Sequence, residues 1–136
     1  MSVNSNVYGV SVRNVGSYQV SGTPFVTGST SALSNGSETK IEFPTVTKSF
    51  MIHFDSAGSN TNTLDIHFVP VATAPNVISN DHYIRILAGD SFTFNVKCKE
   101  VYITSNGTGN RFQLVAELTN IPTRAMFALT GSGISD

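Results

Sequence analysis

Two histidines and one aspartate are the residues of this chain whose types and spacing could support chemistry. His53 lies just before the polar loop 55–62, and Asp65 and His67 follow it. If that loop joins a hairpin, the three side chains share the solvent side of two neighbouring strands. Imidazole and carboxylate groups suit zinc or iron, so a metal-dependent enzyme is one hypothesis. A polar cross-strand cluster on an exposed face is the alternative, and we favour it.

The remaining reactive groups form no catalytic pattern. The third histidine, His82, is expected at the surface end of a strand, and Cys98 shares the apolar parity of Phe94 and Val96. That parity predicts a small buried hydrophobe in place of a reactive thiol. No G-x-S-x-G elbow occurs, and no glycine-rich segment lies between a strand and a helix. We therefore predict no enzyme activity, no catalytic residue, no metal site and no cofactor.

Period-two alternation dominates the chain beyond residue 37 and predicts strands. The parity of the apolar positions flips across Pro44 and again at Lys99–Glu100, which indicates a corner, a bulge or a change of sheet. Many short strands separated by turn signals are typical of a sandwich. The predicted fold is all-β: a single antiparallel β-sandwich, jelly-roll-like, with an extended N-terminal arm. The eight candidate strands are 38–43, 45–54, 63–69, 81–87, 91–98, 100–104, 111–119 and 124–130.

The same alternation predicts which side chains form the core. They are large apolar residues at the inward parity of the central strands. We expect this core to contain Phe50, Ile52, Phe92, Phe94 and Leu114.

The first 37 residues differ from the rest, because Arg13 is their only charged residue. We divide the chain into a low-charge arm, 1–37, and a sandwich domain, 38–136. Valine, tyrosine and phenylalanine recur within the arm, so we predict that it adds as a strand to a sheet edge of a partner. By size, the predicted anchors are Tyr8, Tyr18, Phe25 and Val26. The alternative is a Ser/Gly/Asn-rich leader without a role.

Composition excludes several partners. Charged residues make up 12% of the chain, about half of the usual share of roughly 25%. The net charge is −1 and the basic residues are scattered, so we expect no nucleic-acid partner. No apolar run approaches the roughly 20 residues of a membrane span. The N-terminus lacks a signal-peptide pattern, so synthesis in the cytoplasm is expected.

Four stretches carry a family resemblance: "GSYQVSGTPFVTGS", "KIEFPTVTKSF", "HYIRI…SFTFNVKCKEVYI" and "AELTNIP…MFALTGSGI". Together they resemble small β-sandwich structural proteins of tailed-bacteriophage virions, of the capsid decoration (cement) kind. The resemblance implies a non-enzymatic protein that binds the major capsid protein on the outside of the shell and stabilises it. It also implies virion localisation after synthesis in the host cytoplasm, and a homo-oligomer, for which we favour a trimer over a dimer.

A carbohydrate- or receptor-binding module of a phage tail or fibre is the alternative function. Such modules present aromatic platforms, and Tyr102 has the parity opposite to Val101 and Ile103, so it is the candidate exposed ring. Glycan affinity that depends on Tyr102 would favour this alternative.

Overall fold

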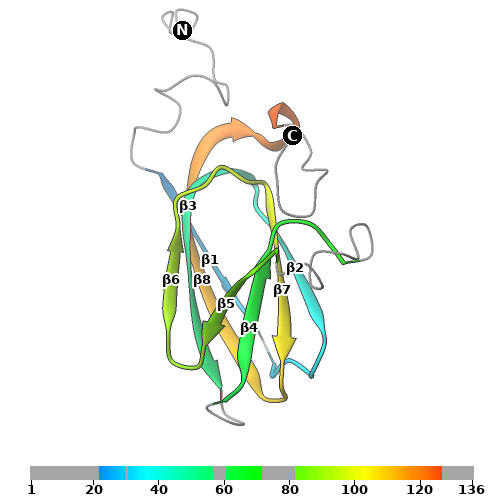
Figure 1. Ribbon diagram of the computed structural model, residues 1–136. Coiled ribbons are helices and arrows are strands. Elements are labelled where there is room, and N and C mark those ends of the chain that lie inside the picture. The colour runs from blue at the N-terminus through cyan, green and yellow to red at the C-terminus, as the bar shows by residue number, and fades with distance from the viewer. Residues whose placement is uncertain (1–21, 30, 57–60, 72–81, 127–136) are drawn as a thin grey trace, which may run out of the picture.

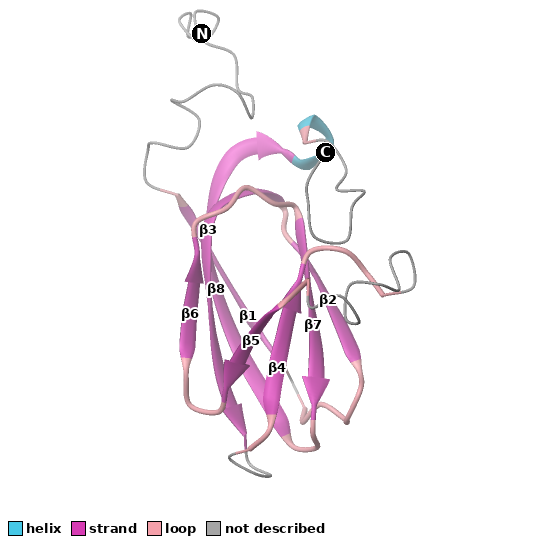
Figure 2. Cartoon of the chain, viewed as in Figure 1, coloured by secondary structure: helices cyan, strands magenta, loops and turns pink. Residues whose placement is uncertain are grey.

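The computed structural model describes residues 22–29, 31–56, 61–71 and 82–126. These residues form two facing four-stranded sheets and one short 3-10 helix (Figures 1 and 2). The elements in chain order are β1 Thr23–Gly28, β2 Glu38–Glu42, β3 Thr45–Ser56, β4 Thr63–His67, β5 Ile84–Leu87, β6 Ser91–Phe94, β7 Glu100–Asn106, β8 Asn110–Pro122 and the helix η2 Thr123–Ala125.

The strand order is that of a jelly roll. One sheet, called here the β1 sheet, has the order β1-β8-β3-β6, and the other, the β2 sheet, has the order β2-β7-β4-β5. All pairs are antiparallel, and four of them join β1 to β8, β2 to β7, β3 to β6 and β4 to β5. The chain thus doubles back on itself and rolls into two layers, as in double Greek-key sandwiches. The predicted all-β, jelly-roll-like antiparallel sandwich is confirmed.

Both predicted parity flips mark a change of sheet. Pro44 lies between β2 and β3, which belong to different sheets, and residues 95–99 connect β6 to β7 across the sandwich. A proline suits such a corner because it donates no ladder hydrogen bond. The flip in apolar parity follows, since a strand entering the other sheet must turn its apolar side the opposite way.

The sandwich begins earlier than predicted. Residues 23–28 form β1, which pairs with β8 from Thr23 opposite Leu118 to Gly28 opposite Gln113. The backbone of Leu33 also bridges to Asn110. The boundary predicted at residue 37/38 is therefore wrong, because the low-charge segment finds a sheet edge in its own chain.

The end of the sandwich also differs from the prediction. Thr123–Ala125 is a 3-10 helix where a strand over 124–130 was predicted, and residues 127–130 lie outside the described residues. The number of strands agrees with the prediction only because β1 takes the place of this last one.

The core lies between the sheets. Phe50, Ile52, Phe94 and Leu114 are buried there, as predicted. The rings of Phe50 and Phe94 stack with centroids 4.8 Å apart. Phe92 is the exception: it has the inward parity, opposite Ile52, but 44% of its surface is exposed. Among the described residues, its strand β6 is the last of its sheet, and no further strand covers Phe92 on that side.

Candidate partner interface and the polar face opposite

The predicted cluster of His53, Asp65 and His67 is divided between the two sheets. His53 belongs to β3 of the β1 sheet, and Asp65 and His67 belong to β4 of the β2 sheet. The hairpin on which the cluster depended is wrong, because the chain changes sheet between β3 and β4. Among the described residues, no three histidine, cysteine, aspartate or glutamate side chains gather as a metal site would require. The metal-enzyme hypothesis therefore loses its ligand set.

His67 is fully buried on the outer side of the β2 sheet. Its Nδ1 lies 2.8 Å from the carbonyl oxygen of Val69, and its Nε2 lies 2.8 Å from Oγ1 of Thr104. Because a carbonyl only accepts, Nδ1 carries the proton and Nε2 accepts from the threonine hydroxyl in the neutral ring. Both ring nitrogens are thus engaged within the chain, which is the pattern of a structural histidine.

Asp65 is equally enclosed. Its carboxylate accepts two hydrogen bonds from Arg85, from Nε at 2.8 Å and Nη2 at 3.1 Å, and one from Nδ2 of Asn106 at 2.8 Å. The guanidinium of Arg85 also lies over the ring of Tyr83, 5.1 Å from its centroid. Such bidentate pairing fixes both partners. This carboxylate is used to hold neighbouring strands together.

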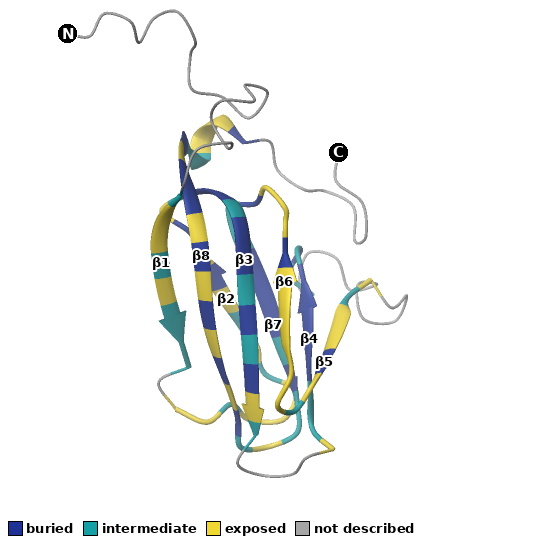
Figure 3. Cartoon of the chain, turned by 90° about the vertical axis from the view of Figure 1, so that its left-hand side faces the viewer, coloured by how far each residue is buried: buried dark blue, intermediate teal, exposed yellow. Residues whose placement is uncertain are grey.

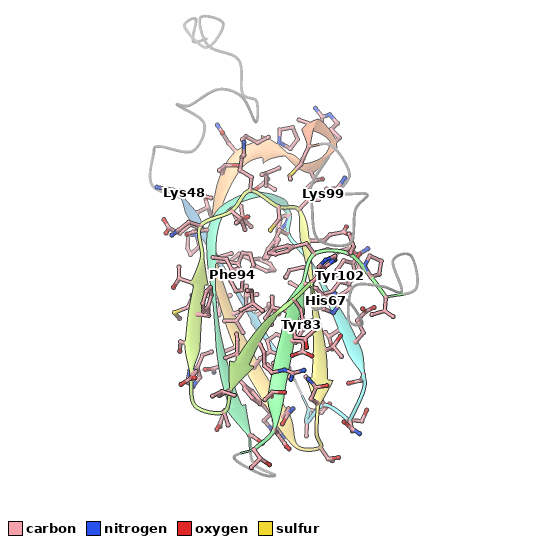
Figure 4. All side chains as sticks on the ribbon, in the orientation of Figure 1. Lys48, His67, Tyr83, Phe94, Lys99 and Tyr102 are labelled. Atoms are coloured by element: carbon pink, nitrogen blue, oxygen red, sulfur yellow. The ribbon has the colours of Figure 1, made fainter. Side chains whose placement is uncertain are left out.

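Tyr102 lies opposite His67 on the outer side of the β2 sheet, and we call this side, with Asp65, His67 and Tyr102, the polar face. Tyr102 is buried there, so its predicted exposure is wrong. Its ring stacks on that of His67 with centroids 6.0 Å apart and planes at 11° (Figure 4). Its hydroxyl donates to the carboxylate of Glu100. Burial raises the pKa of the Tyr102 phenol well above its usual range, and the hydrogen bond and charge of Glu100 add to that rise. The outward parity was right, but outward does not mean exposed where neighbouring side chains fill the space.

Cys98 is buried, as predicted. Burial raises the pKa of its thiol to about 11, a rise that the hydrogen bond with Thr47 opposes. The sulfur lies 3.3 Å from Oγ1 of Thr47. Burial and this raised pKa both disfavour the thiolate, which is the reactive form of a cysteine.

The outer side of the β1 sheet differs from that of the β2 sheet in the side chains that it carries; Figure 3 shows the strands of the β1 sheet coloured by burial. Two adjacent rows of outward side chains cross all four strands there, and none of them is an aspartate, glutamate, lysine or arginine. We call these two rows the uncharged face. They are Val26, Val115, Met51 and Thr93, then Gly28, Gln113, His53 and Ser91.

Apolar side chains on the uncharged face are open to solvent. Val26 is 72% exposed, and Val115 is also exposed. An open groove of about 500 Å³ runs over this region, lined by Val26–Ser29, Met51, His53 and Phe112–Val115. Gly28 leaves the groove free of a side chain, and a Cβ at that position would come within 2.8 Å of the carbonyl oxygen of Phe112. The groove thus depends on glycine at this position.

Charges return only at the two ends of the uncharged face. Toward one end, Glu117 accepts a hydrogen bond of 3.0 Å from the hydroxyl of Ser49. Toward the other, Asp55 and Arg111 occupy opposite positions of β3 and β8. An uncharged centre with charged margins matches the general anatomy of protein interfaces, whose cores are depleted of charge.

The predicted anchors of the arm have different outcomes. Tyr8 and Tyr18 lie outside the described residues. Phe25 points into the sandwich, where its ring meets Phe43 edge-on with centroids 5.7 Å apart, so it anchors its own strand to the core. Val26, the next residue, lies on the uncharged face. Alternation within β1 explains this split, since successive side chains point to opposite sides of a strand.

Sequence reasoning missed Met51, Gln113 and Val115 as surface residues that could meet a partner. A signal was available, because these positions have the outward parity of predicted strands and carry no charge. It becomes visible as a continuous face only once the register of β1, β8 and β3 is known.

Comparisons with known proteins assign no family. No protein-family model and no curated protein matches the chain. Among solved structures, a cupin superfamily protein from Desulfitobacterium hafniense is similar with a TM-score of 0.40 and 10% identity, over 71% of this chain and 78% of that one. Within the described residues, no helix is long and apolar enough to cross a membrane.

Proposed function

We propose that this chain is a non-enzymatic structural protein of a phage virion, which binds the outside of the capsid shell as a decoration protein. The uncharged face is the observation that carries the proposal. On its paired strands this face exposes Val26 and Val115, with the half-buried Met51 beside Val115. The major capsid protein is the proposed partner, with a homo-oligomer, a trimer before a dimer, as the bound form.

Desolvation favours this face over the opposite one. Covering valine and methionine removes apolar area from water, which contributes about 25 cal/mol per Å². The two central rows contain no aspartate, glutamate, lysine or arginine that would have to lose its hydration. The single-copy affinity need not be high, because an oligomer that contacts a repeating shell gains from multivalency.

A carbohydrate- or receptor-binding module remains the second candidate, with less in its favour. Tyr102 is buried against His67, and the ring of Tyr83 lies under the guanidinium of Arg85. Neither ring offers the open aromatic surface on which sugars stack. The groove on the uncharged face is lined mainly by aliphatic and amide groups.

The test places a charge on the uncharged face and measures binding to shells. Val26→Asp, in the full chain, should weaken binding to purified shells that lack this protein by at least about tenfold, which corresponds to about 1.4 kcal/mol. Co-sedimentation with increasing protein gives the affinity. Leu87→Asp is the matched control, because Leu87 is 56% exposed on the outer side of the β2 sheet. It should bind as the unchanged chain does.

Two outcomes would contradict the proposal. Equal losses for Val26→Asp and Leu87→Asp would mean that the uncharged face is not the docking surface. Failure of the unchanged chain to bind any shell, with selective retention on a glycan array, would move the assignment to the carbohydrate-binding alternative.

A further inference from the structure

One side of the sandwich is open between the last strands of the two sheets, β5 and β6. Ile84 lies opposite Ile66 and Phe92 lies opposite Ile52, so both have the inward parity. Yet Ile84 is 42% exposed and Phe92 44% exposed, whereas their partners are fully buried. We call this opening, with Ile84, Phe92 and the exposed Val96, the lateral mouth; the strands beside it are largely exposed in Figure 3. Core-facing side chains therefore meet solvent there.

The strand edge beside the lateral mouth lacks the usual protection. Edge strands are commonly guarded by charge or proline. Of the four edge strands, β1 contains Pro24, β5 contains Arg85, and β2 contains charged residues at alternate positions. The segment 91–96, which includes β6, reads Ser-Phe-Thr-Phe-Asn-Val and has neither. It is the edge best suited to receive another strand.

The chain itself contains a segment suited to this edge. Before Arg13, apolar side chains alternate at Tyr8, Val10 and Val12, and no charged residue interrupts them. A strand with that pattern has one apolar side three residues long. At about 3.3 Å per residue, the nine residues between Val12 and Gly22 reach up to about 30 Å, which limits how far the segment can extend from its own β1.

We propose that residues 8–12 of a second copy add as a strand to β6 and cover the lateral mouth with Tyr8, Val10 and Val12. Main-chain hydrogen bonds to β6 supply affinity, and the three apolar side chains bury Ile84 and Phe92. This inference rests on the homo-oligomer of the proposed function, but not on binding to a shell.

The positions of donor and acceptor determine the kind of contact that a second copy makes. The segment enters the sandwich at β1, and β6 is at the opposite edge of the same sheet. Donor and acceptor at opposite edges make a head-to-tail contact, which closes into a ring when the rotation between copies allows it. A direct β6-to-β6 pairing would give a two-fold dimer and leave the segment unused.

Cross-linking between two different variants tests the proposal without a shell. Ser11→Cys and Thr93→Cys have outward parity on the proposed donor and acceptor strands. We expect a short bis-maleimide to convert most of an equimolar mixture of the two full-length variants to a covalent dimer. Lys40→Cys, on the edge strand β2, replaces Thr93→Cys in the control and should give at least tenfold less. The unchanged chain, whose Cys98 is buried, should give no product.

A proline substitution gives a second, independent readout. Val10→Pro removes a ladder donor from the proposed strand, so it should raise the dissociation constant of the oligomer at least tenfold by light scattering. Asn4→Pro, outside residues 8–12, should leave that constant unchanged.

Each of three results would overturn the proposal. Thr93→Cys cross-linking to itself as efficiently as to Ser11→Cys would indicate direct pairing of β6 edges. In a further variant that carries both Ser11→Cys and Thr93→Cys, cross-linking confined to single chains would indicate that a chain's own segment covers its mouth. Equal products with Thr93→Cys and Lys40→Cys would indicate no selective site. If the unchanged chain still binds shells, the decoration function stands and only the strand exchange is wrong.

Discussion

The outer sides of the two sheets differ in how their polar groups are used. On the β2 sheet, the buried groups Asp65, His67 and Tyr102 each have partners within the chain. On the β1 sheet, the central rows hold valine, methionine, glutamine and serine, and much of this surface is open. The side with more ionisable groups is thus the closed one. The chemically plain side is left available to a partner.

This difference follows from the cost of burial. A buried carboxylate or imidazole must be paired or hydrogen-bonded, and once its partners are satisfied it has little capacity left for a ligand. An exposed valine has no such requirement and loses only water when it is covered. Buried and paired ionisable residues therefore mark the part of this protein that stabilises the fold, and the absence of acidic, lysine and arginine side chains marks the candidate interface.

The core between the two faces sets the largest expected effect. Phe94→Ala should lower the free energy of unfolding by about 3–5 kcal/mol, because it leaves a cavity against the stacked ring of Phe50. Denaturant titration followed by circular dichroism measures it. Phe92→Ala, at the half-exposed lateral mouth, should cost less than half as much when the protein is monomeric. Equal costs would mean that the mouth is closed in solution.

A matched pair of histidines tests the comparison of the faces directly. His67→Ala should cost about 2–4 kcal/mol, since it creates a cavity and removes the partners of Thr104 and Val69. His53→Ala, on the uncharged face, loses a bond of 2.8 Å to the hydroxyl of Ser91 in a partly exposed setting. It should change the free energy of unfolding by no more than about 0.5 kcal/mol.

The reverse order of these two effects would contradict the comparison. If His53→Ala proved as costly as His67→Ala, the uncharged face would contribute to the fold and could not be considered a free docking surface. The same denaturant titration on both variants decides this.

Much of the fold could be predicted from alternation alone. Strands β2 to β8 all fall within or close to the predicted ranges. The parity flips at Pro44 and near Lys99 correctly located two changes of sheet. These signals are local, because they depend on which side of one strand is apolar.

Pairing between distant strands could not be predicted in the same way. The segment "TPFVTG" is short and contains proline, and Phe25 is the only large apolar side chain that it directs inward. Its assignment to the sandwich depends on pairing with β8, which lies almost a hundred residues later. The loop 55–62 has a length that suits a hairpin, but it leads to the other sheet. Loop length does not distinguish the two connections.

The candidate site was the least predictable part. Parity correctly predicted that Asp65, His67 and Tyr102 point outward from their strands, but their burial depends on neighbours such as Arg85 and Thr104, which come from other strands. The uncharged face needs the register of four strands to appear. Two of its residues were named from sequence, but Val26 was assigned to the arm and His53 to a polar cluster with Asp65 and His67.

The smallest expected effect concerns the polar face, where alkaline pH should reduce stability through Tyr102. Because burial and Glu100 raise the pKa of Tyr102 in the folded protein, the unfolded chain releases this proton first. Stability is therefore full below the unfolded tyrosine pKa of about 10 and falls as pH rises through it. By pH 10.5 the loss of unfolding free energy from this residue should be about 0.8 kcal/mol.

The Tyr102→Phe variant isolates this effect. It should cost about 1 kcal/mol at pH 7 by removing the bond to Glu100, but it should lose correspondingly less stability between pH 8 and 10.5. Cys98, whose raised pKa acts in the same direction, is present in both proteins, so its contribution cancels in the difference. Parallel profiles of unfolding free energy against pH for the two proteins would mean that Tyr102 is open to solvent, and that the polar face is less buried than its contacts indicate.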